Sequence, residues 1–377
     1  MSANEPAVKA DLNPTGTEHP GNTLVLPGQA PDGQYILSVL LKRSYRFAHN
    51  SRCVRAEKDR KLVSGDQHYQ DPMNSSVRFE SDFVPYKLAT DVVLNGKVYS
   101  PNGQPAQELV ATLMVGDYRK DIVVVGDRVC HYRPQADPVF TEPEPFSVME
   151  IRYERAYGGV DIYSDRKMPC VYARNHLGCG FAIRNAKETV DNLSLPNIEN
   201  PSDRLTPERL CIGHFMHWER QPMPQGFGWF AKHWQPRSLL AGVLPADRKY
   251  EEELRAVYTQ LIPPEQRELY EQTRLPDMDF RFFNGASPGL ALPFLQGNEL
   301  VRSRYLAPEG IVAFQLPGDR PRIGLDIGFG LQEPPVVLHT VMIHMDEREV
   351  DLVWRGEVSY PGPDWLPEMA KLELSVQ

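Results

Sequence analysis

The sequence has no long hydrophobic run, and its N-terminus has neither a basic stretch nor an apolar core. A membrane helix needs about 20 consecutive apolar residues, and a secretory signal needs both of those N-terminal features. The five cysteines are scattered and form no Cys-x-x-Cys pair, which argues against a disulfide framework and against a structural zinc site. We therefore expect a cytoplasmic protein with reduced thiols.

An excess of basic residues is also missing, because 41 Lys and Arg stand against 50 Asp and Glu, for a net charge of −9. Nucleic acid and anionic membranes both favour a basic face, so neither is the expected partner. The chain of 377 residues holds 34 prolines and 27 glycines, a composition that favours many turns and few long helices. These proportions predict a mainly β protein.

The strand pattern supports this fold class. Asn95-Gly96 lies between apolar halves and predicts a hairpin, because a type I′ turn needs two residues that tolerate positive φ. Gly116-Asp117 predicts a second hairpin, and Asp346–Arg348 predicts a turn near the end of the chain. We expect an antiparallel β-sandwich or two abutting sheets, with strands at 35–47, 92–100, 109–115, 122–132, 146–157, 311–317, 322–328, 336–344 and 350–358.

Three segments depart from the strand pattern. Residues 1–22 are polar and aperiodic, which predicts a flexible tail ahead of one mostly β domain at 23–377. The loop-rich stretch 158–235 is where two subdomains would divide. Between 247 and 273 we expect a helical hairpin, inserted among the strands, because the apolar side chains there recur at helical spacing. That apolar stripe includes Tyr250, Leu254 and Tyr258.

Histidines and aspartates offer one route to catalysis. His214, His217 and His233 come nearest to a zinc-ligand spacing, and Asp277 and Asp279 share a strand face where two carboxylates could hold a cation. Together they define the alternative of a metal-dependent hydrolase. The more ordinary interpretation is of hydrogen-bonded histidines and of aspartates at a turn, and no nucleophile motif supports catalysis.

Aromatic residues are dense at 226–237. Trp229, Phe230 and Trp234, followed by Arg237, have the composition of a protein-interface anchor. The same rings suit a core between sheets, which is the more frequent role of such residues. As a third possibility, Trp229 and Trp234 would be sugar-stacking platforms of a carbohydrate-binding module.

Nine segments follow one another in an order that resembles a known family. The series is similar to the bacterial type VI secretion adaptors catalogued as domain of unknown function 2169. The segments are SDFVPYKLATDVVLNG (81–96), VVGDR (124–128), YERAYGG (153–159), NHLGCG (175–180), LPNIENP (195–201), GFGWFAKHWQPR (226–237), DMDFRFFNGA (277–286), GNELV (297–301) and VDLVWRG (350–356).

The resemblance implies an adaptor or chaperone in the bacterial cytoplasm, with no catalysis, no cofactor and no metal. Such a protein binds a cognate toxic effector and loads it onto the secretion spike, which consists of a VgrG-like protein and a PAAR-repeat tip. The inserted hairpin is an expected place for cargo specificity, because surface loops vary readily. The residues expected to bind protein are Trp229, Phe230, Trp234, Arg237, Tyr250, Leu254 and Tyr258.

Charged and polar residues within these segments have a different expected role. We interpret them as buried or half-buried partners that fix loops onto sheets, because they stand in strands or in tight Gly turns. On this interpretation their loss would lower stability rather than abolish partner binding. The residues are Asp82, Lys87, Asp91, Asp127, Arg128, Glu154, Arg155 and Asn284.

Overall fold

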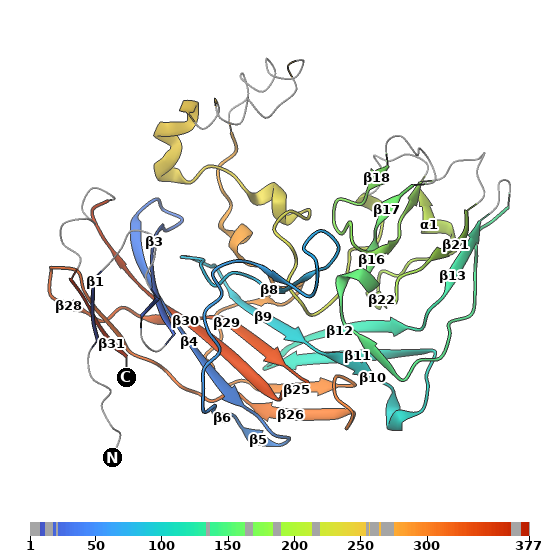
Figure 1. Cartoon of the computed structure of the whole chain (residues 1–377), viewed down its shortest axis with the longest axis horizontal. Helices are drawn as coiled ribbons and strands as arrows, with labels where there is room; N and C mark the ends of the chain where they lie inside the picture. The colour runs from blue at the N-terminus through green and yellow to red at the C-terminus, as the bar shows by residue number, and fades with distance from the viewer. Residues whose placement is uncertain are drawn as a thin grey trace.

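The computed structural model is mainly β, as the composition predicts (Figure 1). No helix among the described residues is long and apolar enough to cross a membrane. The helical segments of the described residues are short. They are η1 (Pro101–Gly103), η2 (Tyr153–Arg155), α1 (Pro207–Leu210), η4 (Arg237–Leu240), η5 (Pro245–Tyr250) and η6 (Phe280–Phe283). The structure describes residues 8–11, 18–19, 22–132, 136–162, 169–183, 190–212, 219–253, 256, 264, 275–362 and 371–376.

The larger of the two main sheets has eight strands, with β30 and β29 near its centre. The β29–β30 hairpin and its turn at 345–348 confirm the pairing expected near the end of the chain. The pair β29–β9 is parallel, whereas the other strand pairs in this sheet are antiparallel. The order is β2 (Glu18–His19), β3 (Thr23–Gln29), β4 (Tyr35–Arg46), β30 (Glu349–Ser359), β29 (Val336–His344), β9 (Thr90–Asn95) and β24 (Ala291–Leu292), with β6 (Val54–Arg55) beside β4.

A second sheet of six strands packs against the first, and in Figure 1 the strands of the two sheets run in clearly different directions. One core cluster joins Val341 and Leu352 of the first sheet to Leu113, Ile122 and Phe314 of the second. The expected hairpin at Gly116-Asp117 is confirmed. The order is β22 (Ile198–Glu199), β12 (Tyr118–Val125), β11 (Glu108–Val115), β25 (Leu300–Arg304), β26 (Ile311–Gln315) and β5 (Ser51–Arg52).

The hairpin predicted at Asn95-Gly96 is wrong. β9 pairs with β29 and β24, whereas β10 (Lys97–Tyr99) pairs with β15 (Val148–Glu150). Neither residue of the dipeptide has positive φ. Both edges of β9 are occupied inside the larger sheet, so Asn95-Gly96 links two sheets instead of closing a turn.

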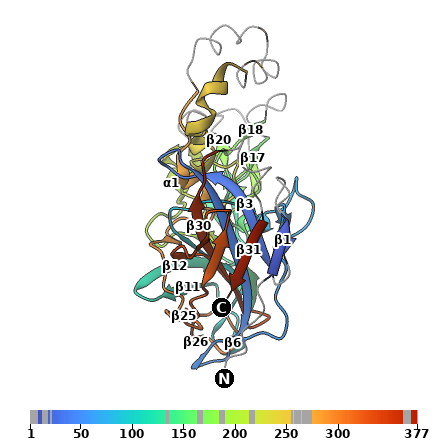
Figure 2. The same cartoon turned by 90° about the vertical axis from the view of Figure 1, so that its left-hand side faces the viewer.

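A four-stranded sheet lies beside β3, β4 and β30, and the apolar side chains between them form a second core. Its strands β1 (Val8–Asp11) and β31 (Lys371–Val376) lie side by side in Figures 1 and 2. Residues 8–11 and 18–19 therefore form strands where the sequence predicts a flexible tail, because backbone pairing at a sheet edge requires no apolar periodicity. The other two strands are β27 (Ile323–Asp326) and β28 (Leu331–Gln332).

Several short strands lie among the loops of the region that the sequence places at 158–235. They pack around a small core that includes Tyr157, Tyr172 and Phe181. The strand predicted at 146–157 is instead β15 followed by η2. The remaining strands of the described residues are β7 (Gln67–His68), β8 (Val77–Phe79), β13 (Val129–Tyr132), β14 (Val139–Phe140), β16 (Tyr157–Gly158), β17 (Val160–Asp161), β18 (Cys170–Val171), β19 (Cys179–Gly180), β20 (Ala182–Ile183), β21 (Val190–Ser194) and β23 (Cys211–Ile212).

Gly158 makes a close backbone contact that only glycine permits. Its φ is +151°, and a Cβ atom there would lie 2.0 Å from the carbonyl oxygen of Asn175. We expect Gly158→Ala to lower the free energy of unfolding by about 2 kcal/mol, as measured by chemical denaturation. Gly65→Ala is the control, since nothing lies within 4 Å of that Cβ position. Equal stability of the two variants would contradict the prediction.

Candidate functional site

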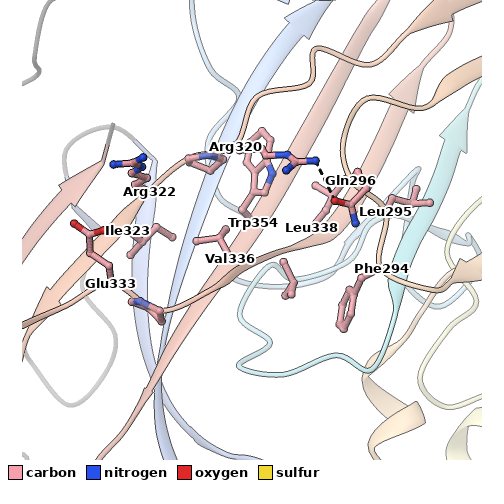
Figure 3. Close-up of a pocket in the computed structure, with 13 residues that line it drawn as sticks. Phe294, Leu295, Gln296, Arg320, Arg322, Ile323, Glu333, Val336, Leu338 and Trp354 are labelled. Atoms are coloured by element: carbon pink, nitrogen blue, oxygen red, sulfur yellow. Dashed lines mark hydrogen bonds between the residues drawn. The ribbon is translucent and has the colours of Figure 1, made fainter.

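A cleft of about 690 Å³ opens between β29, β30 and β27 (Figure 3). We call it the arginine-rimmed cleft. Its apolar lining comes from four parts of the chain that are far apart in the sequence. These side chains include Phe294, Leu295, Ile323, Val336, Leu338 and Trp354.

The rim of the cleft is charged. Arg320 and Arg322 are exposed on either side of the buried Pro321. The Arg320 guanidinium donates to the Gln296 side chain at 3.2 Å, whereas Arg322 makes no hydrogen bond or ion pair within the described part of the chain. Figure 3 shows Arg322 and Glu333 at one end of the cleft and Gln296 at the other.

A strand edge also faces this cleft. β30 pairs along the length of β29, but β9 pairs with it only from Thr340 to His344. Among the described strands, Val336–Leu338 therefore has a neighbour on one side only. The register between β29 and β30 shifts between Leu338 and Thr340, so a β-bulge marks the point where pairing on the β9 side begins. The Leu338 carbonyl already accepts from the buried Thr90 hydroxyl at 2.6 Å. The backbone groups of this edge that are left to pair with another chain are therefore those nearer Val336.

A second concavity, of about 760 Å³, is lined mainly by polar side chains, and we call it the polar groove. Four of the segments singled out from the sequence meet there. They contribute Asp127 and Arg128, Glu154 and Arg155, Cys179, and Asn197. Residues from Gln70 to Asn197 thus form one surface.

The arginines of the polar groove are already paired. Arg128 donates to Glu199 at 2.7 Å, and the side chains of both residues are nearly buried. Arg155 donates to the Asn197 amide oxygen at 3.0 Å and lies 3.5 Å from Asp127. Asp127 differs from the expected buried partner, because 69% of its side chain is exposed. Most of the charged side chains of the groove are therefore paired with one another or with neighbouring residues of the same chain.

Asp91 is the centre of a buried network that ties a loop to β9. Its carboxylate accepts from Lys87 at 2.7 Å, from the Asn284 amide at 3.1 Å and from the backbone N–H groups of Gly285 and Ala286. Asp91 is fully buried, and Lys87 is 5% exposed. A carboxylate with this many donors is satisfied without a ligand.

Two more carboxylates of the segments bind loops in the same way. Asp82 accepts from Lys42 at 2.9 Å and from the backbone N–H of Val63 at 2.8 Å. Glu154 accepts from the backbone N–H and the hydroxyl of Ser76, at 2.8 and 2.7 Å. Each contact joins parts of the chain that are far apart, which fits a role in stability.

A family model matches residues 32–355, a stretch that contains the polar groove and every residue of the arginine-rimmed cleft. The chain belongs to the family DUF2169. That family is described as an uncharacterized protein conserved in bacteria. The membership confirms the family to which the nine segments pointed, whereas the description assigns it no activity and does not link it to type VI secretion. No curated protein and no solved structure matches the chain.

The aromatic cluster of this DUF2169 protein is buried, so its predicted role as an exposed anchor is corrected. Trp229, Phe230, Trp234 and Arg237 are each no more than 4% exposed. The three rings belong to the main core, and Arg237 forms two hydrogen bonds with the carboxylate of Glu80. No partner, whether protein or sugar, can reach these side chains in this conformation.

Other predicted residues fall outside what the structure describes. Leu254, Tyr258, His214 and His217 lie outside the described residues, as does the side chain of Tyr250, whose backbone ends η5. The helical hairpin is therefore described only in part, as η5 and the helical residues 251–253, 256 and 264.

The remaining residues of the hydrolase hypothesis are separated or paired. His233 packs against the ring of Trp234, and burial lowers its pKa. Asp277 pairs with Arg248, whereas Asp279 caps η6 by accepting from the backbone N–H of residue 281. Within the described ranges, no group of three or more His, Cys, Asp or Glu side chains is placed to hold a metal ion.

The sequence analysis missed the arginine-rimmed cleft. Arg320 and Arg322 stand between two predicted strands, a position that also suits an ordinary turn. Trp354 lies in a predicted strand, and nothing in its local sequence marks it as part of a cleft. The available signal was two arginines around a proline, and it does not indicate which distant segments complete the surface.

Proposed function

We propose that this chain is an adaptor, which binds a cognate toxic effector in the bacterial cytoplasm and helps to load it onto the type VI secretion spike. The VgrG-like protein and the PAAR-repeat tip of the spike are the other partners in this proposal. The observation that carries it is the ordered series of nine segments at 81–356, which resembles that adaptor family. Membership of DUF2169 over residues 32–355 supports the comparison of the whole chain.

The geometry of the arginine-rimmed cleft supports a role in protein binding. Protein interfaces combine apolar floors with arginine, and they exclude water around a few central side chains. Here the half-buried Phe294 and Val336 contribute to the floor, and Arg320 and Arg322 stand at the rim. We therefore take the cleft as the effector-binding surface of the proposed adaptor.

Co-expression with the products of neighbouring genes tests the adaptor function. We expect an effector or a spike protein to co-elute with this chain at a defined stoichiometry, as measured by size-exclusion chromatography with light scattering. A chain that elutes alone as a monomer, with each neighbour present and soluble, would contradict the proposal. Metal analysis and an activity screen would then address the hydrolase alternative.

A further inference from the structure

The arginine-rimmed cleft presents three different kinds of contact at one place. The first is an apolar floor that includes the half-buried Phe294 and Val336. The second is the cationic pair Arg320 and Arg322 on the rim. The third is the edge of β29 at Val336–Leu338, which has no strand on its β9 side among the described residues. A ligand that uses all three must itself carry apolar groups, negative charge and a backbone.

The strand edge restricts the shape of such a ligand. An extended peptide that adds to a strand edge makes main-chain hydrogen bonds, and its side chains then alternate between the two faces of the sheet. On one face they would meet the floor of the cleft. The open edge is short, so it provides only a few hydrogen bonds and leaves specificity to the side chains.

The charges of the rim restrict the ligand's chemistry. Arg322 is exposed and unpaired within the described part of the chain. Arg320 donates one N–H group to the neutral side-chain amide of Gln296. Guanidinium groups bind carboxylates with charge-assisted and often bidentate hydrogen bonds. Glu333 is the acidic side chain of the lining. The negative charge of Glu333 repels a ligand carboxylate that binds at the same end of the cleft.

Apolar surface continues beyond the cleft. Leu331 is 57% exposed in β28, which leads directly into Glu333 and Pro334 of the lining, and Phe329 is 62% exposed just before it. Large exposed apolar side chains next to a groove mark an interaction surface.

We propose that the arginine-rimmed cleft binds an extended segment of a protein partner in which acidic and apolar residues alternate. The segment pairs with the edge of β29, places apolar side chains over Phe294 and Val336, and directs carboxylates to Arg320 and Arg322. The identity of this segment as part of the effector rests on the proposed function, whereas its chemistry does not.

Peptide binding to the full chain tests the chemistry. The probe is a short fluorescein-labelled peptide of alternating Asp and Leu, and the matched probe is of alternating Lys and Leu, both followed by fluorescence anisotropy. We expect the acidic peptide to bind and the basic peptide to bind at least about tenfold more weakly. Equal binding of the two peptides would overturn the proposal.

Three variants then test the location. Arg322→Glu is expected to weaken binding of the acidic peptide on the order of tenfold, and Glu333→Gln is expected to strengthen it. Arg302→Glu is the matched control, because Arg302 is exposed on β25, lies outside the cleft and gives the same change in net charge. If Arg302→Glu weakens binding as much as Arg322→Glu does, attraction by net charge alone explains the result and the proposal fails.

The co-elution assay separates this inference from the proposed function. An effector complex that survives Arg322→Glu, together with an acidic peptide that does not bind, would overturn the assignment of the cleft and leave the adaptor function intact. Peptide binding with the expected variant pattern, in a chain that co-elutes with no partner, would support the cleft and contradict the adaptor function.

Discussion

Replacing Arg237 by Met is expected to lower the free energy of unfolding by about 3 kcal/mol or more. Arg237 and Glu80 are each largely buried, and their side chains form two parallel hydrogen bonds of 2.8 and 2.6 Å. Arg237 also donates to the backbone carbonyls of Phe230 and Phe282. The substitution leaves a buried carboxylate without its partner, which is more costly than the loss of one hydrogen bond.

Chemical denaturation of the full chain measures this effect, and two further variants identify its cause. Arg281→Met removes an arginine from an exposed ion pair with Asp279, so it is expected to change stability by no more than about 0.5 kcal/mol. The double variant Arg237→Met with Glu80→Leu removes the unpaired charge and is expected to recover part of the loss. If Arg237→Met lowers the free energy of unfolding no more than Arg281→Met does, the pair Arg237–Glu80 does not stabilise the fold as inferred.

Lys232 limits the size of the effect. Its ammonium group lies 3.5 Å from the Glu80 carboxylate, so some positive charge remains near Glu80 after Arg237 is replaced. A loss of about 3 kcal/mol therefore lies at the lower end of the usual range for a broken buried pair. Replacing Lys232 by Met in the Arg237→Met background is expected to increase the loss further.

Local sequence patterns predict those parts of the fold that are made by neighbours in the chain. The pairs β11–β12 and β29–β30 follow from alternating apolar residues around a turn. The Asn95-Gly96 dipeptide carries the strongest turn signal and still forms no hairpin, because β9 gains more partners inside the larger sheet. Tertiary pairing overrides local turn chemistry there.

The candidate site is harder to predict for a related reason. The arginine-rimmed cleft combines residues around 295, 321, 335 and 354, and no local pattern shows that they meet. The buried aromatic cluster shows a second limit of prediction from sequence, because its local pattern is clear but has two possible meanings. A run such as GFGWFAKHWQPR has the same composition in an interface and in a core, and only the surrounding sheets decide between the two.

Lys120 is expected to make the stability of this protein depend strongly on pH. It projects from β12 and donates to the Ser287 hydroxyl at 2.6 Å and to the Pro288 carbonyl at 2.7 Å, and among the described residues no carboxylate pairs with it. Burial lowers the pKa of Lys120 to about 7. In the unfolded chain the pKa of a lysine is about 10.4. Between these two values the unfolded chain binds more protons than the folded chain, so the free energy of unfolding rises with pH.

Comparison with Lys120→Met isolates this contribution from other titrating groups. Relative to the variant, the unaltered protein is expected to gain on the order of 3 kcal/mol of stability between about pH 6 and about pH 9.5. Below about pH 7 the lysine is protonated in both states and the difference stops changing. Lys58→Met, at an exposed position, is the control, and its difference from the unaltered protein should stay within about 0.5 kcal/mol. A Lys120→Met difference that is equally flat across this range would show that the buried amine keeps its charge, and the surrounding core would then have to supply an anion or water to hold it.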